Sequence, residues 1–199
     1  MFALESDIRK DAPAGLFLSR KGNWFHDGDQ LHHSRMCSLL HRSIERDDDD
    51  LIVTTGRDRL SFVAEDAPYR IKLIEKRVVS STPSDVLLGA QPSAAKECIV
   101  ITCSDDESEI LQRSHVWATT ADGAIYLSVK SGRFWALLSS GAQQWLQPYL
   151  QEDDDGNGFH LSFPADWTSE PSTKSLTDDE NTLFSLKKEG DEFNPAAHP

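Results

Sequence analysis

Residues 153–158, Asp-Asp-Asp-Gly-Asn-Gly, have the types and spacing of the first half of a calcium-binding loop. Carboxylates at alternate positions followed by a glycine at the sixth form a tight oxygen cage in such loops. Here the twelfth position, which should supply a bidentate glutamate, is Pro164, and the eighth is His160 instead of an aliphatic residue. An acidic turn is therefore the favoured interpretation, and we predict no metal site.

A second group of candidate residues surrounds a predicted helix. His33, Cys37 and His41 lie at i, i+4 and i+8, where one helix face would offer nitrogen and sulfur ligands to zinc. Such residues cannot surround a metal ion, because the outer two are about 12 Å apart on a straight helix. His32 or His33 beside Asp27 could instead form the proton-transfer pair of a hydrolase. Core packing is the favoured role for Cys37, and turn formation is favoured for His32, His33 and Asp27.

A third polar group consists of Glu65 and Asp66, which precede Ala67-Pro68-Tyr69 between two alternating stretches. In the structural interpretation, Asp66 hydrogen-bonds backbone amides of a turn. In the functional interpretation, the two carboxylates face a cleft between two halves of the protein. The cations available to pair with them are Arg57, Arg59 and Arg70.

The usual signatures of nucleotide binding and covalent catalysis are missing. Gly-x-Gly-x-x-Gly, the Walker lysine loop and Gly-x-Ser-x-Gly do not occur in the sequence. We therefore predict no catalytic residue, no cofactor and no enzyme activity. Nucleotide-binding geometries other than a conventional phosphate cradle stay open.

Charge and composition limit the partners. Thirty-three Asp and Glu stand against 20 Lys and Arg, a formal charge of −13, which repels a phosphate backbone and predicts no nucleic-acid partner. No apolar run approaches the roughly twenty residues of a membrane helix, so we predict no membrane partner. The 3 cysteines lack a Cys-x-x-Cys spacing and come without a signal peptide, which indicates reduced thiols and a cytoplasmic protein.

Local patterns predict the elements that hold these residues. Residues 16–18 and 24–25 are apolar and flank a turn composition, which predicts a hairpin. Apolar residues between 36 and 44 recur at helical spacing, with Ser34 as the expected N-cap. Further strands are predicted at 51–53, 60–64, 69–79, 98–103, 125–129 and 159–163.

The second half contains a long connection, a closing helix and a tail. Residues 80–95 are rich in Ser, Pro and Ala. Large apolar residues from Phe134 to Leu146 lie about one turn apart and predict a helix. The polar and acidic stretch 168–199 predicts a disordered tail.

Several motifs recur in one known combination: Gly22-Asn23-Trp24-Phe25, Gly28, the helix near Ser34, Val53-Thr54-Thr55 and Glu65-Asp66-Ala67-Pro68-Tyr69. This combination resembles the bacterial family called domain of unknown function 1285. The second half is similar to it at 125–132, with Lys130 in place of an arginine, and at Phe134-Trp135-Ala136. The sequence departs from the family at Thr55-Gly56, where the family has Thr-Pro, and at Ser139-Ser140, where it tends to have an arginine.

The resemblance covers about residues 15–150 and implies a duplicated α+β core whose second half is superficially like a pleckstrin-homology barrel. It also implies a nucleotide-like ligand at the interface between the halves and a role in signal transduction. We accordingly predict an α+β protein with two related halves, 15–80 and 81–165, around one continuous core, and a disordered acidic tail at 168–199.

The leading functional hypothesis is a cytosolic sensor that binds a small anionic ligand between its halves. Its ligand-binding residues would be cations, the carboxylates that position them and an aromatic ring: Arg57, Arg59, Arg70 and Lys130, Glu65 and Asp66, and Trp24 or Tyr69. One alternative is a protein-interaction module without a small-molecule ligand, which docks a protein partner through a sheet edge or the closing helix. The other is the hydrolase considered above.

Overall fold

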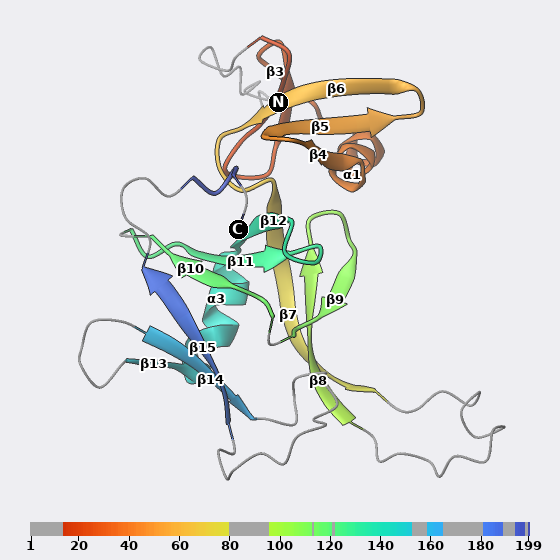
Figure 1. Cartoon of the computed structure of the whole chain (residues 1–199). Helices are drawn as coiled ribbons and strands as arrows, with labels where there is room; N and C mark the ends of the chain where they lie inside the picture. Colours follow the sequence, from red (N-terminus) through yellow and green to blue (C-terminus); the bar gives the residue numbers. More distant parts are fainter. Residues whose placement is uncertain are drawn as a thin grey trace, which may run out of the picture.

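The structure, a computed structural model, describes residues 14–79, 96–112, 114–120, 122–152, 159–164, 181–188, 194–197 and 199. These residues form a six-stranded sheet and a nine-stranded sheet, accompanied by helices α1 (Ser34–Arg42) and α3 (Ser140–Leu146) (Figure 1). The mixed α+β class predicted from the sequence is confirmed. The long connection at 80–95 and the acidic turn at 153–158 lie outside the described residues.

The first sheet has the strand order β3-β2-β1-β6-β5-β4. Its strands are β1 (Leu16–Leu18), β2 (Trp24–His26), β3 (Asp29–Gln30), β4 (Ile44–Asp47), β5 (Asp50–Thr55) and β6 (Asp58–Ala64). The predicted hairpin is confirmed, because β1 pairs antiparallel with β2 through a turn that contains Gly22 at φ +84°. Glycine suits this position because it adopts positive φ without steric cost. β1 also pairs parallel with β6.

Helix α1 packs against β5 of this sheet. Its N-cap is His33, whose Nδ1 accepts a hydrogen bond from Met36 N at 3.3 Å, so Ser34 is the first helical residue and not the predicted cap. The helix ends where Ser43 N donates to the carbonyls of Leu39 and Leu40. The buried residues of this helix are Leu40 and His41, and its other residues are exposed or half-buried.

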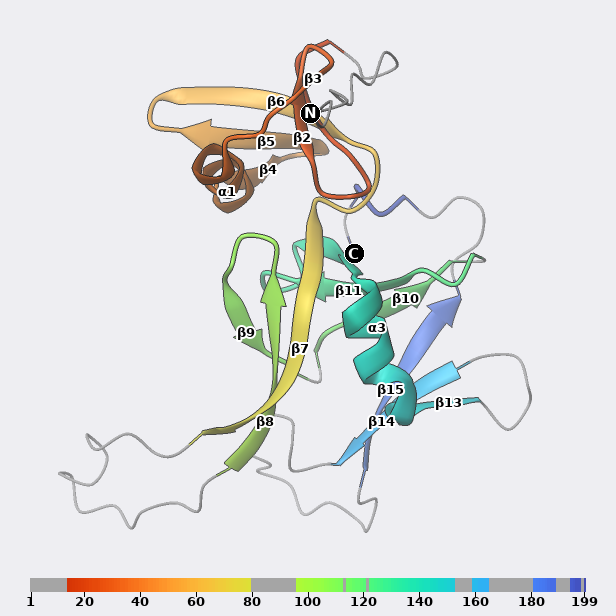
Figure 2. The same cartoon turned by 180° about the vertical axis from the view of Figure 1, so that it is seen from behind.

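The second sheet has the order β13-β14-β15-β10-β11-β12-β7-β8-β9. Its strands are β7 (Tyr69–Val79), β8 (Lys96–Cys103), β9 (Ser108–Ile110), β10 (Trp117–Thr119), β11 (Ile125–Val129), β12 (Phe134–Leu138), β13 (Leu150–Glu152), β14 (Phe159–Pro164) and β15 (Asn181–Lys188). Helix α3 packs against β7 and β12 and continues into a 3-10 helix, η1 (Gln147–Tyr149). Figure 2 shows α3 lying along β7.

The prediction of a helix from Phe134 is wrong for residues Phe134–Leu138, which form β12. This strand lies between β7 and β11, and all of its side chains are buried. A strand covered on both faces carries a continuous apolar run, which periodicity alone does not distinguish from a buried helix. The helix begins only at Ser140, after Ser139 Oγ accepts from Ala142 N at 3.3 Å.

Two predicted boundaries also change. β7 belongs to the second sheet, so the chain passes between the sheets at residues 65–68 and not at residue 80 (Figure 1). Residues Asn181–Lys188, predicted as disordered tail, form β15, which pairs antiparallel with β14 and parallel with β10. The sequence prediction missed this strand because its few apolar residues are scattered among polar ones.

One apolar cluster joins both sheets, as predicted. It includes Leu18, Trp24 and Val53 of the first sheet and Ile71, Ile99 and Leu127 of the second. Within the described part of the chain, no helix is long and apolar enough to cross a membrane.

Candidate ligand-binding cleft

The two aromatic residues predicted to stack on a ligand lie in the core. Trp24 is fully buried, with its ring centroid 4.9 Å from that of Phe62, and its Nε1 donates to His41 Nδ1 at 2.9 Å. Tyr69 is buried against Phe134, with ring centroids 5.3 Å apart. The structure therefore assigns both rings to packing, because neither is exposed to a ligand.

Arg57 and Arg59 lie on the hairpin of β5 and β6. Arg57 is in its turn, and Arg59 pairs with Asp47 of β4 at 3.1 Å. The tip of this hairpin extends away from the β6–β7 connection that carries Asp66 (Figures 1 and 2). These two arginines are thus not brought to the predicted carboxylates.

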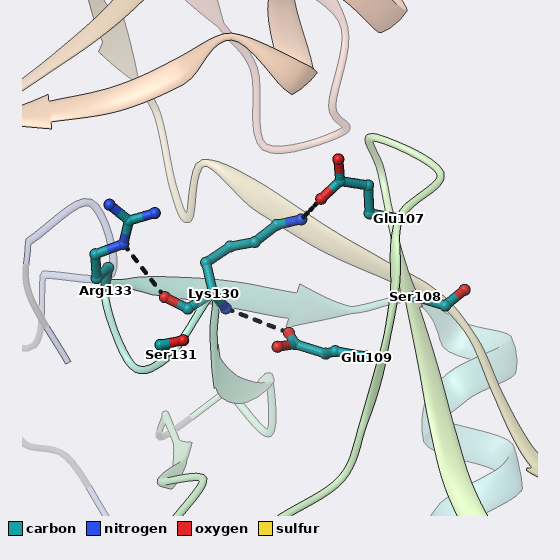
Figure 3. Close-up of a pocket in the computed structure, with 6 residues that line it drawn as sticks. All are labelled: Glu107, Ser108, Glu109, Lys130, Ser131 and Arg133. Carbon is teal, nitrogen blue, oxygen red and sulfur yellow. Dashed lines mark hydrogen bonds and ion pairs between the residues drawn. The ribbon is translucent and has the colours of Figure 1, made fainter. Parts of the chain in front are cut away.

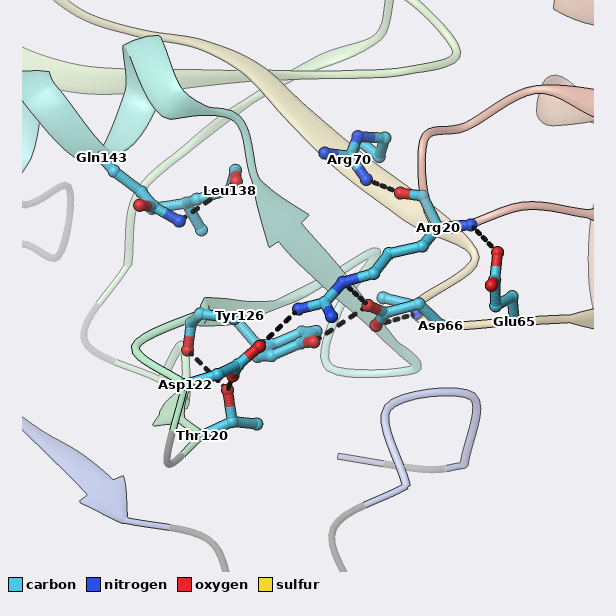
Figure 4. Close-up of polar contacts among 11 residues, drawn as sticks. Arg20, Glu65, Asp66, Arg70, Thr120, Asp122, Tyr126, Leu138 and Gln143 are labelled. Carbon is cyan, nitrogen blue, oxygen red and sulfur yellow. Dashed lines mark hydrogen bonds and ion pairs between the residues drawn. The ribbon is translucent and has the colours of Figure 1, made fainter.

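The cation that meets Asp66 is Arg20, which sequence reasoning missed (Figure 4). Asp66 Oδ2 accepts from Arg20 Nε at 2.9 Å and from the Tyr126 hydroxyl at 3.1 Å, and Oδ1 accepts from Ala67 N at 2.6 Å. Glu65 Oε2 accepts from Arg20 N at 2.8 Å. Burial and the nearby Asp66 carboxylate raise the pKa of Tyr126, which keeps its hydroxyl protonated as a donor. This network ties the β1–β2 turn to the start of the second sheet.

Arg70, at the start of β7, reaches the same turn. Its guanidinium donates to the backbone carbonyl of Arg20. A Cβ at Gly22 would lie 2.9 Å from Arg70 Cδ, so the turn and the arginine side chain are in close contact. Burial lowers the pKa of Arg70, although the field of Asp66 opposes this effect. Arg70 is therefore held between the two sheets, as the sequence hypothesis requires.

Lys130 lies in the β11–β12 turn at φ +54° and lines a different pocket from Arg70 (Figure 3). Its Nζ donates to Asp105 at 2.6 Å and Glu107 at 2.7 Å and lies 5.5 Å from the centre of the Tyr69 ring. The pocket beside it has a volume of about 280 Å³ and is lined by Glu107, Ser108, Glu109, Lys130, Ser131 and Arg133. Lys130 is neutralised here by carboxylates, which disfavours anion binding.

A larger cleft, of about 360 Å³, lies between the two sheets and contains Arg70. The β1–β2 turn, α1 and the second sheet each contribute to its wall: Lys21 and Gly22, then Ser34, Cys37, Ser38 and His41, then Arg70, Ile71, Lys72, Ser104 and Ser139. The four α1 residues share one face of the helix because they are spaced by three or four positions. The volume is at the lower end of the range for small-molecule sites, roughly 300–1,000 Å³.

The cleft is locally basic in an acidic protein. Lys21, Arg70 and Lys72 contribute cations, and no carboxylate is among the lining residues that the structure describes. Lys72 Nζ pairs with Asp106 at 2.8 Å, and this bond lowers the pKa of the exposed Asp106. Serine hydroxyls from α1 and from Ser104 add donors, whereas the hydroxyl of Ser139 donates to the Lys72 carbonyl at 3.3 Å. The arrangement is suited to a small oxyanion.

The residues considered for zinc and for hydrolysis have other partners. Cys37 Sγ donates to Leu31 O at 3.2 Å, and His33 caps α1. Asp27 Oδ1 accepts from Gly15 N at 2.8 Å. Among the described residues, no three His, Cys, Asp or Glu side chains are grouped so that they could hold a metal ion.

Sequence reasoning found Arg70 but missed Lys21 and Lys72, and it considered His41 only as a zinc ligand. One signal was available, because Arg70 and Lys72 flank Ile71 at the alternating positions that share a face in a regular strand, although the register of β7 shifts between Ile71 and Leu73. Lys21 and His41 come from other elements, and only the tertiary fold brings them to this face.

A solved structure shares this architecture. The structure aligns with the crystal structure of a DUF1285 family protein from Silicibacter pomeroyi DSS-3 at a TM-score of 0.58 and 18% identity, covering 89% of this chain and 81% of that chain. The chain has the fold of this DUF1285 protein. A DUF1285 family protein from Shewanella baltica OS155 aligns at a TM-score of 0.40 and 17% identity, covering 63% of this chain and 84% of that chain. No family model and no curated protein matches the sequence. The resemblance carried by the sequence motifs is thus confirmed at the level of the fold.

Proposed function

We propose that the protein binds a small, nucleotide-like anion in the cleft between α1 and β7 and acts as a cytoplasmic sensor without enzyme activity. The observation that carries the proposal is the meeting of Lys21, Arg70 and Lys72, from two different sheets, in a cleft without lining carboxylates among the described residues. Because Lys72 is paired with Asp106, the cations of this cleft that are left for an anion are Lys21 and Arg70, in a chain of formal charge −13.

Arg70 is the central ligand contact of this proposal. A guanidinium presents donors in a planar fork that matches two oxygens of a phosphate or carboxylate. Arg70 is partly buried and already donates to the Arg20 carbonyl, so its orientation is fixed before a ligand arrives. Preorganisation of this kind reduces the entropy lost on binding.

The signalling role follows from where the ligand would lie. The cleft walls belong to separate sheets, so a bound anion would contact both and favour one relative position of the two units. We also propose that the two halves are related by duplication and that the second is superficially pleckstrin-like; the packing of one helix against each sheet, α1 on the first and α3 on the second, supports the first idea.

A thermal-shift screen of the full chain against nucleotides, cyclic nucleotides and phosphorylated metabolites tests the proposal. A ligand at a hundred times its dissociation constant adds about 2.7 kcal/mol of stability. We expect Arg70→Ala to lose the shift and Arg57→Ala, which removes the same charge from the β5–β6 turn, to keep it. A shift that is unchanged in Arg70→Ala would refute binding at this cleft.

A protein-interaction module is the second candidate. Met36 and Leu39 are 40% and 52% exposed on α1, and large exposed apolar side chains are typical of docking surfaces when they adjoin. A screen without any hit would favour this candidate over the sensor.

A further inference from the structure

His41 is a buried imidazole with one nitrogen in use and one without a partner. Its side chain lines the cleft from α1, and the residue is only 6% exposed. Nδ1 lies 2.9 Å from Trp24 Nε1. Nε2 is buried and has no hydrogen-bond partner in the described part of the chain. Because the two nitrogens of an imidazole point in diverging directions, Nε2 faces away from Trp24.

The contact with Trp24 fixes which nitrogen of His41 carries the proton. An indole N–H can only donate, so Nδ1 must accept with its lone pair. The neutral ring then carries its proton on Nε2. The carbonyl of Cys37 is also 3.1 Å from Nδ1, which would suit a proton there. That alternative would set two N–H groups against each other and leave the fully buried Trp24 unpaired, whereas the Cys37 carbonyl retains its helical bond.

The surroundings of His41 keep the ring neutral. Burial is the largest influence and lowers its pKa, and Lys72 acts in the same direction. The Cys37 carbonyl and the carboxylates of Asp105 and Asp106 oppose this shift but are weaker. His41 therefore presents a neutral, directed N–H and not a positive charge.

We propose that the Nε2–H of His41 determines the specificity of the cleft: it donates to an oxygen of an oxyanion, a phosphate or phosphate ester, whose charge is balanced by Arg70. This inference rests on the proposed function and adds the atom that recognises the ligand. It selects ligands that present an acceptor at this point and disfavours ammonium groups, which would set a donor against Nε2–H. Trp24 acts as a positioning residue, because it holds the tautomer without touching the ligand.

The tautomer can be measured without any ligand. Nitrogen-15 NMR of the full chain distinguishes a protonated from an unprotonated ring nitrogen. We expect His41 in the free protein to carry its proton on Nε2, and Trp24→Phe to give a mixture of the two tautomers. A proton on Nδ1 in the unaltered protein would overturn the inference.

Calorimetric titration with inorganic pyrophosphate tests the contact itself. We expect His41→Leu to bind on the order of ten- to a hundredfold more weakly, as for a lost hydrogen bond to a charged group, and His41→Gln to recover part of the affinity. Because His41→Leu leaves the Trp24 N–H unpaired, the double variant Trp24→Phe/His41→Leu is the folding control. It removes both polar groups and is expected to recover stability without recovering affinity.

The outcomes separate the two proposals. Full affinity in both His41→Leu variants, with loss in Arg70→Ala, would overturn the role of His41 and leave the proposed function standing. No pyrophosphate binding by the unaltered protein would overturn the proposed function, and the specificity role with it, even if NMR shows the expected tautomer. Weakened binding in the double variant with the expected tautomer supports the inference.

Discussion

Asp66 allows a direct test of how the two sheets are held together. Its carboxylate accepts from Arg20, Tyr126 and Ala67, and its side chain is 5% exposed whereas that of Arg20 is 47% exposed. Asparagine has the same shape but replaces one acceptor oxygen with an amino group and removes the charge. Asp66→Asn should therefore weaken the junction between the sheets without leaving a cavity.

The magnitude follows from the partners that are lost. The amino group can donate to the Tyr126 oxygen, and the remaining oxygen can keep the bond from Ala67, so Arg20 is the partner that loses its acceptor. A hydrogen bond to a charged group is worth about 1.5–3 kcal/mol, reduced here because Arg20 is half exposed to water. We expect a loss of about 2 kcal/mol, or a decrease in Tm of roughly 4–8 °C for a domain of this size.

Urea unfolding monitored by tryptophan fluorescence measures this loss. A matched control is Asp122→Asn, since Asp122 also pairs with Arg20, at 3.1 Å, but is 58% exposed. Exposed ion pairs contribute little, so the control should unfold close to the unaltered protein. If Asp66→Asn and Asp122→Asn unfold at the same urea concentration, the buried carboxylate does not stabilise the junction and the reasoning fails.

Two further predictions concern the turns. Gly22→Ala should lower the free energy of unfolding by about 1–3 kcal/mol, because Gly22 has φ +84° and a Cβ there would lie 2.9 Å from Arg70 Cδ. Gly15→Ala, at φ +91° with no atom within 4 Å, should lower it less in the same thermal unfolding assay. Equal losses in the two variants would exclude a role for the Arg70 contact. Lys130 lowers the pKa of Glu107 below its ordinary 4.5, so this pair stabilises the fold above that value and loses its effect as the pH falls through the lowered pKa. Glu107→Gln, which removes the titrating carboxyl and leaves the pair of Lys130 with Asp105, should therefore flatten the decrease of stability between about pH 6 and about pH 3, modestly because Glu107 is exposed. An unchanged slope in acid unfolding would contradict this coupling.

Sequence patterns predicted strands from β-branched and aromatic residues between turn signals as well as from alternation. In β6, buried Phe62 lies between exposed Ser61 and Val63, which is the period of two that burial on one face imposes, whereas four of the five side chains of β11 are buried. Residues Phe134–Leu138 lack this period because both faces of β12 are covered. Residues Asn181–Lys188 read Asn-Thr-Leu-Phe-Ser-Leu-Lys-Lys, with few apolar residues among polar ones, which leaves a weak signal in the sequence.

The candidate site was predictable only in part, because its residues come from distant elements. The Glu65–Tyr69 segment drew attention to Arg70 because it contains a proline turn between two strands, and the chain passes from one sheet to the next at this turn. Residue type alone left Trp24 and Tyr69 open between packing in the core and stacking on a ligand, because aromatic rings serve both purposes. Nor could it show that Arg20, and not Arg57 or Arg59, meets Asp66, since that contact depends on the β1–β2 turn reaching the second sheet.

The position of β15 has a consequence for folding during synthesis and for truncated chains. β10 ends at Thr119 and pairs on one side with β11, whereas its other neighbour, β15, begins only at Asn181. While the chain emerges from the ribosome, one edge of β10 therefore stays unpaired until residues 181–188 have been synthesised. An open strand edge is a template for pairing with other chains. Chains that stop before Asn181 are thus expected to aggregate, so removal of the acidic C-terminal region is not a neutral truncation.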